Sequence, residues 1–496
     1  MSEIRKPARV RVAPSPTGHM HLATARTALY DYLLARQTGG KFVLRIEDTD
    51  QRRTVPGSEQ EIMDGLRWLG LEYDEGPDVG GPFGPYRQTE RRDLYLEHSD
   101  ILVERGSAYP CFCTADRLET VRAQQKQKKE ASHYDGTCRR LDPDEARRRV
   151  RSGERHVIRF KMPREGTTRA HDLLRGEIVI ENRNVDDYVI LKSDGLPTYH
   201  LAAMVDDHHM QITHVLRGAE WLSTFPLHVN VVRAFGWEEP TWAHLSLFLK
   251  PSGKGKLSKR DASQAIRDGY SVFIKDLHDL GFIPEGVLNW IVLMGWGVAE
   301  DDVMNLQEMS QRFDLSRLTP SPAAINFTKL DHFNSSHIRR LSDEELARRV
   351  RPFFTSLELP VRDDVLLRIA PLIKERLTTL DEAPTMAGFF FRDDVHPRSE
   401  DLVPKGMSAV EVVAILQESL ALTSAMGELR AEATEAAFRG LVQRLSRPAG
   451  EVFGVLRIAT TGQRVSPPLF QSMAIIGREK VLSRLQGALD RLRQPM

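Results

Sequence analysis

The stretch 11–24 places a histidine at the start of a predicted helix and reads Arg-Val-Ala-Pro-Ser-Pro-Thr-Gly-His-Met-His-Leu-Ala-Thr. A strand-like alternation covers 8–13, prolines and a glycine interrupt it, and a helical pattern then continues to Gly39 and Gly40. A strand, a tight turn and a helix N-terminus leave backbone N–H groups unpaired, and a phosphate can bind there. Because this arrangement is common, the pattern is equally compatible with a turn that has only a structural role.

Two further groups of residues have suitable chemistry, although neither predicts a site by itself. The basic segment Lys256-Leu-Ser-Lys-Arg260 follows a loop rich in glycine and lysine, and basic loops of this size are in general solvated surface. Cys111, Cys113 and Cys138 are too few for a disulfide scaffold in a chain of 496 residues. Their close spacing still makes them candidates for chemistry.

The elements that must position these residues follow an alternation of strand and helix. A strand is predicted over 41–46, directly before Glu47, and another over 212–216, directly before Arg217. The continuous apolar run at 187–191 predicts a buried parallel strand. Because the alternation is found on both sides of the segment 107–187, we expect a doubly wound parallel sheet with that segment inserted between its halves.

The strings of residues are more specific than the pattern of elements. Ala-Pro-Ser-Pro-Thr-Gly-x-x-His at 13–21 resembles the HIGH signature of class I aminoacyl-tRNA synthetases, in the form that glutamyl enzymes use. Lys256–Arg260 resembles their second signature, KMSKS, and two such signatures in this order are not expected by chance. The phrases at 45–50 (Arg-Ile-Glu-Asp-Thr-Asp) and 217–221 (Arg-Gly-Ala-Glu-Trp) match as well. The whole chain therefore resembles the bacterial-type glutamyl-tRNA synthetase family.

The resemblance implies a two-step reaction. The α-carboxylate of L-glutamate attacks the α-phosphorus of ATP, with Mg²⁺ accompanying the nucleotide, and the adenylate then passes its acyl group to the terminal ribose of tRNA-Glu. The nucleophile is already ionised at neutral pH, so no general base is needed. Catalysis must come from positioning and from stabilisation of charge on the phosphoryl oxygens.

The resemblance also implies roles for individual residues. The catalytic set is His21, Thr24, Lys256 and Lys259. The ATP-binding set is Pro14, Gly18, His21, Glu220, Trp221, Leu257 and Lys259. The glutamate-binding set is Arg11, Ala13, Ser15, Glu47, Tyr199 and Arg217. The residues themselves leave alternatives open, since a histidine in this place could cap a helix and Arg11 could lie on an exposed strand face.

Two departures from the family pattern bear on these roles. Ala23 stands where the family usually has glycine, and its methyl group would crowd the adenine. The cysteines, together with Tyr134 four residues before Cys138, are similar to a zinc site of some glutamyl enzymes, but Arg140 replaces the usual histidine ligand. A site formed by Cys111, Cys113, Tyr134 and Cys138 would suit Zn²⁺. Three reduced thiols without a metal are the alternative.

We expect an α/β plus all-α fold with a Rossmann-type catalytic domain. The predicted ranges are the first catalytic half at 1–106, an inserted acceptor-binding domain at 107–187, the second catalytic half at 188–235, a helical stem-contact domain carrying the Lys256–Arg260 loop at 236–335, and helical anticodon-binding domains at 336–400 and 401–496. Basic residues crowd the insertion between 122 and 151, which suits phosphate contacts but also an ordinary solvated helix.

The helical tail separates related enzymes, because the glutaminyl relative carries β-barrel domains there. In strict family members an arginine of the first anticodon domain reads the third anticodon base, and Arg376 matches its position. Arg376 could equally be an exposed helix residue. Whether tRNA-Gln is also charged stays open, and we predict a strict enzyme.

Composition limits the remaining classes of function. The chain has 69 basic and 69 acidic residues, so any tRNA-binding surface must come from local asymmetry. The sequence contains no apolar run of membrane-spanning length and no secretory signal, so we expect a cytoplasmic protein without a membrane partner, and a monomer. A nucleotidyltransferase acting on a small acceptor would not need the long helical tail. Intact His21, Lys256 and Lys259 argue against a tRNA-binding paralogue that has lost the charging activity.

Overall fold

The computed structural model describes residues 7–255, 257, 270–297 and 302–493. These residues fall into two compact units, the first comprising 1–278 and 287–327 and the second 279–286 and 328–496. Each unit is described by itself. None of the helices in the described part of the chain combines the length and the apolar composition that a membrane span requires.

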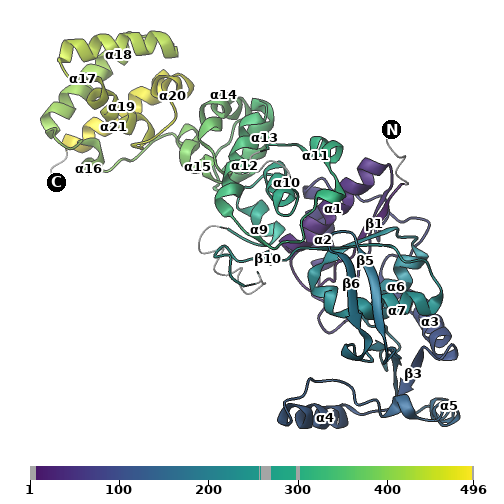
Figure 1. Cartoon of the computed structure of the whole chain (residues 1–496). Coiled ribbons are helices and arrows are strands. Elements are labelled where there is room, and N and C mark those ends of the chain that lie inside the picture. Colours follow the sequence, from purple (N-terminus) through teal and green to yellow (C-terminus); the bar gives the residue numbers. More distant parts are fainter. Residues whose placement is uncertain (1–6, 256, 258–269, 298–301, 494–496) are drawn as a thin grey trace. The chain divides into compact units, whose positions relative to one another are not determined.

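The first unit begins with two parallel strands joined by a helix (Figure 1). β1 (Arg9–Val12) pairs with β2 (Lys41–Leu44), and α1 (Leu22–Thr38) crosses between them. The helix ends at Gly39, whose φ of 65° lies in the left-handed region that glycine adopts without strain. The strand, turn and helix predicted from the sequence around 8–40 are therefore confirmed.

A four-stranded sheet continues the unit in the order β6-β5-β9-β8. β8 (His214–Gly218) and β9 (Thr241–Leu245) run parallel, while β5 (Thr167–Asp172) and β6 (Gly176–Glu181) form an antiparallel hairpin. β5 joins β9 in parallel through Asp172 and Trp242. α6 (Tyr199–His209) precedes β8 and α7 (Phe225–Phe235) connects β8 to β9. The parallel pairs and crossover helices confirm the predicted α/β class.

A second sheet combines two strands of the segment predicted to be an insertion, 107–187, with one strand that follows this segment. β3 (Ala108–Cys111), β4 (Val157–Phe160) and β7 (Val189–Leu191) form it in that order, and both pairs are antiparallel. The prediction of a parallel strand at 187–191 is therefore wrong. A continuous apolar run indicates that a strand is buried, and a buried strand can pair with its neighbours in the antiparallel as well as in the parallel direction. α4 (Ala115–Gln127) and α5 (Pro143–Arg151) complete this region.

Three further strands do not follow the predicted domain ranges. β5 and β6 fall within 107–187, yet they share a sheet with β8 and β9 of the catalytic domain. β9 lies beyond the predicted end at 235 and pairs with β8 along its whole length. The other elements of the unit are α2 (Ser58–Trp68), α3 (Arg92–Glu104), β10 (Phe248–Leu249), α11 (Leu306–Arg312) and β11 (Ala323–Ala324). α9 (Ile274–Asp279) and α10 (Pro284–Leu293) cross the division between the units.

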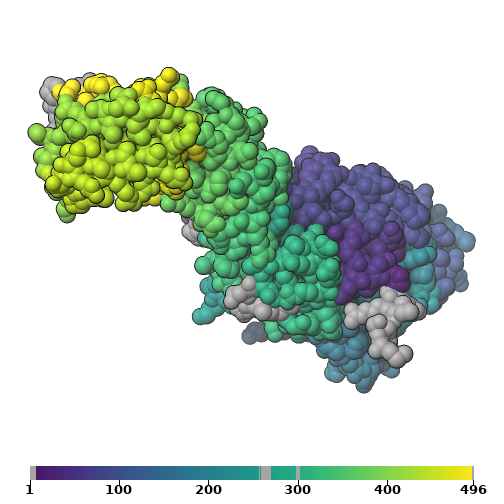
Figure 2. All heavy atoms as spheres, turned by 90° about the horizontal axis from the view of Figure 1, so that it is seen from above, coloured from purple at the N-terminus to yellow at the C-terminus, as the bar shows by residue number. Residues whose placement is uncertain are grey.

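The second unit is helical throughout its described residues. Its helices are α12 (Phe327–Arg340, which begins at the division), α13 (Asp343–Thr355), α14 (Asp363–Ile373), α15 (Glu382–Ala387), α16 (Ser399–Leu402), α17 (Ala409–Ala425), α18 (Ala431–Leu445), α19 (Ala449–Thr461), α20 (Leu469–Ile476) and α21 (Arg478–Arg493). The predicted apolar stripes lie in its core, where Leu416, Phe438, Leu441 and Leu485 are fully buried. Figure 2 draws the outer surface of this unit as green and yellow spheres. The predicted all-helical tail is confirmed.

Candidate functional site

A cavity of about 610 Å³ lies where β1 and β8 end, and we name it the carboxyl-edge pocket. Ligands of doubly wound sheets bind in this place, outside the carboxyl ends of the strands. Most of the residues predicted to form the site line it, namely Arg11, Ala13, Pro14, Ser15, His21, Thr24, Glu47, Tyr199, Arg217, Glu220, Trp221 and Leu257. The structure therefore brings together residues from five separate stretches of the sequence.

Three predicted site residues are not placed in this cavity. Gly18 lies in the bend before His21, with a φ of 120°, and does not line the pocket. Lys256 and Lys259 lie outside the described residues. Leu257 between them is buried, and its backbone N–H donates to the carbonyl of Phe248 at 2.8 Å. This bond holds Leu257 at the wall of the pocket.

His21 caps α1 and lines the pocket at the same time. Its Nδ1 accepts a hydrogen bond from the backbone N–H of Ala23 at 3.0 Å. The N–H of Leu22 donates to the carbonyl of Val272 at 2.8 Å, and the N–H of Thr24 donates to the carbonyl of His21 at 2.9 Å. The prediction of unpaired N–H groups is therefore wrong for the first three residues of this helix. Because Nδ1 acts as an acceptor, the neutral ring carries its proton on Nε2.

A buried network of charges supports one wall of the pocket. Asp207 accepts from Arg11 through two bonds of 3.0 and 3.2 Å, and from Arg45 at 2.7 Å. Burial alone would lower the pKa of Arg11, but Asp207 outweighs this effect and the net shift is upward. Arg11 is therefore a firmly held cation in the interior. Neither Arg45 nor Asp207 was predicted from the sequence, because their partners are distant in the chain.

Glu47 is the acidic member of the pocket. It is buried and accepts from Arg45 Nη2 at 3.2 Å. Burial raises the pKa of Glu47 to about 7, although Arg45 and Arg11 oppose this rise. This carboxyl group therefore titrates in the physiological range and can act as an acceptor for a bound cation above that pH.

Arg217 lines the pocket and has guanidinium N–H groups that are not used in hydrogen bonds to the described residues. Its Nε donates to His244 Nε2 at 2.9 Å, whereas Nη1 and Nη2 are buried and have no hydrogen-bond partner among the described residues. Burial lowers the pKa of Arg217. Leaving a buried guanidinium unpaired is costly, so a site of this kind favours an anionic ligand with two acceptor oxygens. The ring of Trp242 packs against the guanidinium, with its centroid 4.9 Å from Arg217 Cζ.

An aromatic pair and a further arginine complete the lining. Tyr199 and Trp221 stack with ring centroids 3.9 Å apart, which links a predicted glutamate residue to a predicted nucleotide residue. Sequence reasoning missed Arg26, which is buried, lines the pocket and donates to Ser246 Oγ at 3.2 Å. Its position three residues after Ala23, on the same face of α1, is a signal that could have identified it.

The three cysteines converge in the insertion. Their sulfur atoms lie within 4.8 Å of one another, and Cys113 Sγ lies 3.5 Å from Cys138 Sγ. The Tyr134 hydroxyl is 3.5 Å from Cys111 Sγ and 3.4 Å from Cys113 Sγ. Arg140 instead donates to the carbonyl of Asp135, so the structure brings Tyr134 and not Arg140 to the cysteine cluster.

Arg376 lies in the second unit, directly after α14, and is exposed. Its Nη1 donates to the carbonyl of Ser466 at 2.8 Å. Arg457 donates to the same carbonyl at 3.3 Å, and the pKa of Arg457 is lowered by burial and by the neighbouring charge of Arg376. The two guanidinium groups therefore lie side by side on the helical unit.

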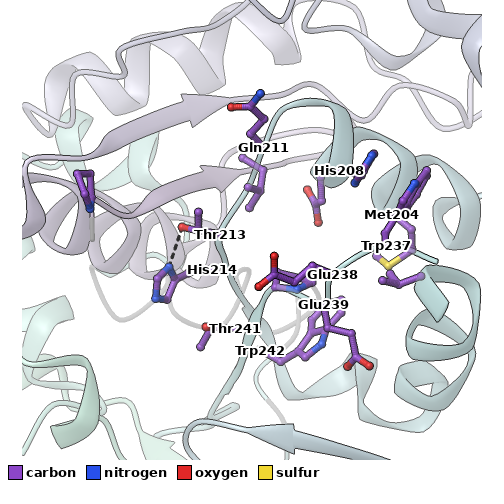
Figure 3. Close-up of a pocket in the computed structure, with 15 residues that line it drawn as sticks. Met204, His208, Gln211, Thr213, His214, Trp237, Glu238, Glu239, Thr241 and Trp242 are labelled. Atoms are coloured by element: carbon purple, nitrogen blue, oxygen red, sulfur yellow. Dashed lines mark hydrogen bonds between the residues drawn. The ribbon is translucent and has the colours of Figure 1, made fainter. Parts of the chain in front are cut away.

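A second cavity of about 520 Å³ lies at the opposite ends of β8 and β9, where the strands begin (Figure 3). We name it the amino-edge pocket. His208, His214, Trp237, Glu238 and Glu239 line it, and Thr213 Oγ1 lies 2.8 Å from His214 Nδ1. None of the residues predicted for the site lies in this cavity.

Family models match the chain in two parts. A model described as the catalytic domain of class I tRNA synthetases (E and Q) matches residues 7–332. A model described as an anticodon binding domain matches residues 345–489.

Individual relatives match over nearly the full length. The glutamate–tRNA ligase of Chloroflexus aurantiacus is 42% identical over 509 residues, which covers 99% of each chain. That of a Roseiflexus species is 42% identical over 500 residues, covering 98% of this chain and 97% of the relative. A crystal structure of a glutamate tRNA ligase from Elizabethkingia meningosepticum, in complex with its amino acid, superposes with a TM-score of 0.89 at 36% identity and covers 98% of this chain.

Proposed function

The chain belongs to the glutamate–tRNA ligases of the class I tRNA synthetases, and we propose that glutamate and ATP react in its carboxyl-edge pocket. The predicted activity, attachment of glutamate to tRNA with use of ATP (EC 6.1.1.17), is confirmed by the full-length relatives. The observation that carries the assignment of the pocket is the buried and unpaired guanidinium fork of Arg217.

The fork of Arg217 suits the side-chain carboxylate of glutamate. The α-carboxylate must stay available to attack the α-phosphorus of ATP, and a carboxylate held in two hydrogen bonds by a buried guanidinium would be a poor nucleophile. Arg217 therefore binds the γ-carboxylate, and Arg11 adds positive charge beside it. Neutral glutamine would leave one guanidinium N–H without an acceptor, so the pocket discriminates against it. Glu47 would accept hydrogen bonds from the α-ammonium group.

The phosphates of ATP would lie near the start of α1. His21 Nε2–H is oriented as a donor because Nδ1 is occupied by the cap, and Thr24 lies in the same turn. Lys256 and Lys259, which stand one residue before and two residues after Leu257 in the sequence, would add cations to the β- and γ-phosphates. Such preorganised donors stabilise the charge that develops on the phosphoryl oxygens. Mg²⁺ would accompany ATP and neutralise part of the triphosphate charge.

The cysteine cluster fits Zn²⁺. Three thiols and one phenolic oxygen converge at distances close to the edges of a tetrahedral site. Arg117 Nη1 donates to Cys113 Sγ at 3.3 Å, so a cation lies directly beside the cluster. Cys111, Cys113, Tyr134 and Cys138 would hold the ion, which would stabilise the insertion. Elemental analysis of protein purified without chelator should give close to one zinc per chain, and Cys138→Ser should release it. Metal-free protein would leave three reduced thiols as the better description.

The insertion and the helical unit would bind tRNA-Glu. A hollow of about 870 Å³ beside the cysteine cluster is lined by Arg122, Arg139, Arg140, Arg159, Arg164 and Arg183, which suits the phosphates of an acceptor end. In the helical unit, Arg376 and its neighbour Arg457 would read the third anticodon base, since cytosine presents acceptors to arginine. The predicted ranges 107–187, 336–400 and 401–496 remain proposals for these domains.

Charging assays test the proposal for tRNA choice. Purified tRNA-Glu and tRNA-Gln are each incubated with radiolabelled glutamate and ATP, with parent enzyme and with Arg376→Gln. The parent should charge only tRNA-Glu, and Arg376→Gln should relax this preference. Arg392→Gln, which changes another arginine of the helical unit, is the matched control and should leave it unchanged. A parent that charges both tRNAs equally well would contradict strict recognition.

A further inference from the structure

Arg217 is the last member of a buried series of three side chains. Asp172 lies at the end of β5, His244 in β9 and Arg217 in β8, on three adjacent strands of one sheet. His244 Nδ1 lies 2.7 Å from Asp172 Oδ2, and His244 Nε2 lies 2.9 Å from Arg217 Nε. All three residues are at most 4% exposed, so water does not compete for these bonds.

The hydrogen bonds around Asp172 fix the proton on the imidazole. Its Oδ1 accepts from the N–H groups of Leu174 and Arg175, each at 3.0 Å, and its Oδ2 accepts from the N–H of His244 at 2.9 Å. Burial alone would raise the pKa of Asp172, but the His244 side chain, and after it these backbone N–H donors, hold that pKa below its ordinary value. An ionised carboxylate can only accept, so His244 Nδ1 must carry the proton and donate it.

The same proton position determines what Arg217 can do. Burial lowers the pKa of His244 to about 4, so the ring is neutral at physiological pH and Nε2 has a free lone pair. Nε2 can then accept from Arg217 Nε–H. A proton on Nε2 would face the cationic guanidinium and push it away. With Nε fixed in this way, Nη1 and Nη2 of Arg217 remain for the pocket.

We propose that Asp172 and His244 are positioning residues for glutamate recognition, which aim the guanidinium fork of Arg217 at the side-chain carboxylate of the substrate. The inference rests on the proposed role of Arg217. It gives the β5–β6 hairpin, which falls within the range predicted for the insertion, a direct part in the amino-acid site. Of the three residues, only Arg217 lines the carboxyl-edge pocket, so Asp172 and His244 would act through Arg217.

Kinetics of tRNA-Glu charging test the proposal. Asp172→Asn leaves a side chain that can donate to Nδ1 and so permits the other tautomer. It should raise the KM for glutamate about tenfold or more while the KM for ATP changes less than about twofold. His244→Phe should do the same, whereas His244→Gln should retain part of the affinity, because its amide can donate to Asp172 and accept from Arg217. His214→Gln, at the start of β8, is the matched control and should leave both KM values unchanged.

Two further measurements separate positioning from a general loss of structure. In ¹⁵N-histidine NMR spectra the signal of His244 is identified by its absence from the His244→Phe variant. In the parent this signal should be that of a neutral ring with an unprotonated Nε2. Asp172→Asn should shift the signal to that of the other tautomer. Adding Asp172→Asn to Arg217→Ala should have no additional effect on the KM for glutamate. If Arg217→Ala itself leaves this KM unchanged, the proposed role of Arg217 fails. If Arg217→Ala raises it but Asp172→Asn and His244→Phe do not, or if the double variant is additive, the positioning inference is overturned.

Discussion

The two pockets at opposite ends of β8 differ in the buried polar groups of their walls that have no hydrogen-bond partner. Their volumes are similar, about 610 Å³ at the carboxyl edge and 520 Å³ at the amino edge. In the carboxyl-edge pocket the buried cation Arg217 has two nitrogens without partners. In the amino-edge pocket the buried unpaired group is the neutral indole Nε1 of Trp242, while Glu239 already accepts from Arg233 at 2.7 Å and His208 stacks on Trp237.

This difference shows that size does not identify a site in this sheet. An unpaired buried charge costs much more free energy than an unpaired indole N–H, so a ligand that pairs with Arg217 would recover more free energy than one that pairs with Trp242. The carboxyl-edge pocket is lined by residues at the ends of parallel strands. The amino-edge pocket is lined by residues at the starts of the parallel strands β8 and β9. The following predictions test this contrast, from the largest expected effect to the smallest.

Lys259→Ala should have the largest effect, because its cation would stabilise the phosphoryl oxygens only in the carboxyl-edge pocket. We expect the rate of glutamyl-adenylate formation to fall about 100-fold, with tRNA binding nearly unchanged. Pre-steady-state kinetics with tRNA-Glu and a filter-binding assay measure the two quantities. Lys254→Ala, in the adjacent loop, is the control. A rate within threefold of the parent would remove Lys259 from the mechanism.

Glu47 should make glutamate binding depend on pH. Its carboxyl group has a pKa of about 7, so it loses its negative charge, and its attraction for the α-ammonium, as the pH falls through that value. The KM for glutamate should therefore rise about tenfold between pH 8 and pH 6, since one pKa unit corresponds to a factor of ten. Glu47→Gln should have a high KM that no longer changes over this range. A parent KM that is independent of pH would contradict the assignment.

Ala23→Gly should have a small effect on ATP. If the methyl group of Ala23 crowds the adenine, its removal should tighten ATP binding up to about threefold or leave it unchanged. Isothermal titration with a non-hydrolysable ATP analogue measures this affinity. A clear loss of affinity would show that other contacts accommodate the methyl group.

Changes in the amino-edge pocket should have the smallest effect. Glu238→Gln and Thr241→Ala change residues that line the amino-edge pocket and do not line the carboxyl-edge pocket. Steady-state charging of tRNA-Glu should give KM values for glutamate and ATP within about twofold of the parent, as expected for surface substitutions. A large loss in either KM would mean that both ends of β8 serve the reaction.

The sequence predicted the members of the carboxyl-edge pocket but not the contacts behind them. Arg11, His21 and Glu47 stand in contiguous strings, and strings of this kind carry the resemblance to the family. Asp207 and Asp172 could not be predicted, because each acts through a partner that is distant in the sequence. Asp207 lies in α6 and pairs with Arg11 of β1, and Asp172 lies at the end of β5 and pairs with His244 of β9. Likewise, the carbonyl of Val272 pairs the N–H of Leu22 from a distant segment.

Errors in the predicted elements have a related physical cause. The apolar run ending at Leu191 correctly indicated burial, but it does not encode the direction of its neighbouring strand. The range ending at 235 separated β9 from β8 because a helix lies between them in the sequence, although the two strands pair in the sheet. Local pattern predicts the type and burial of an element, and tertiary contacts decide its partners.

A crystal structure of the chain with bound L-glutamate tests the central claim most directly. The account predicts that the γ-carboxylate lies in the carboxyl-edge pocket with its two oxygens about 2.9 Å from Nη1 and Nη2 of Arg217. The α-carboxylate should point towards His21 and stay free of Arg217. Glutamate bound with its α-carboxylate on Arg217, or bound in the amino-edge pocket, would contradict the account.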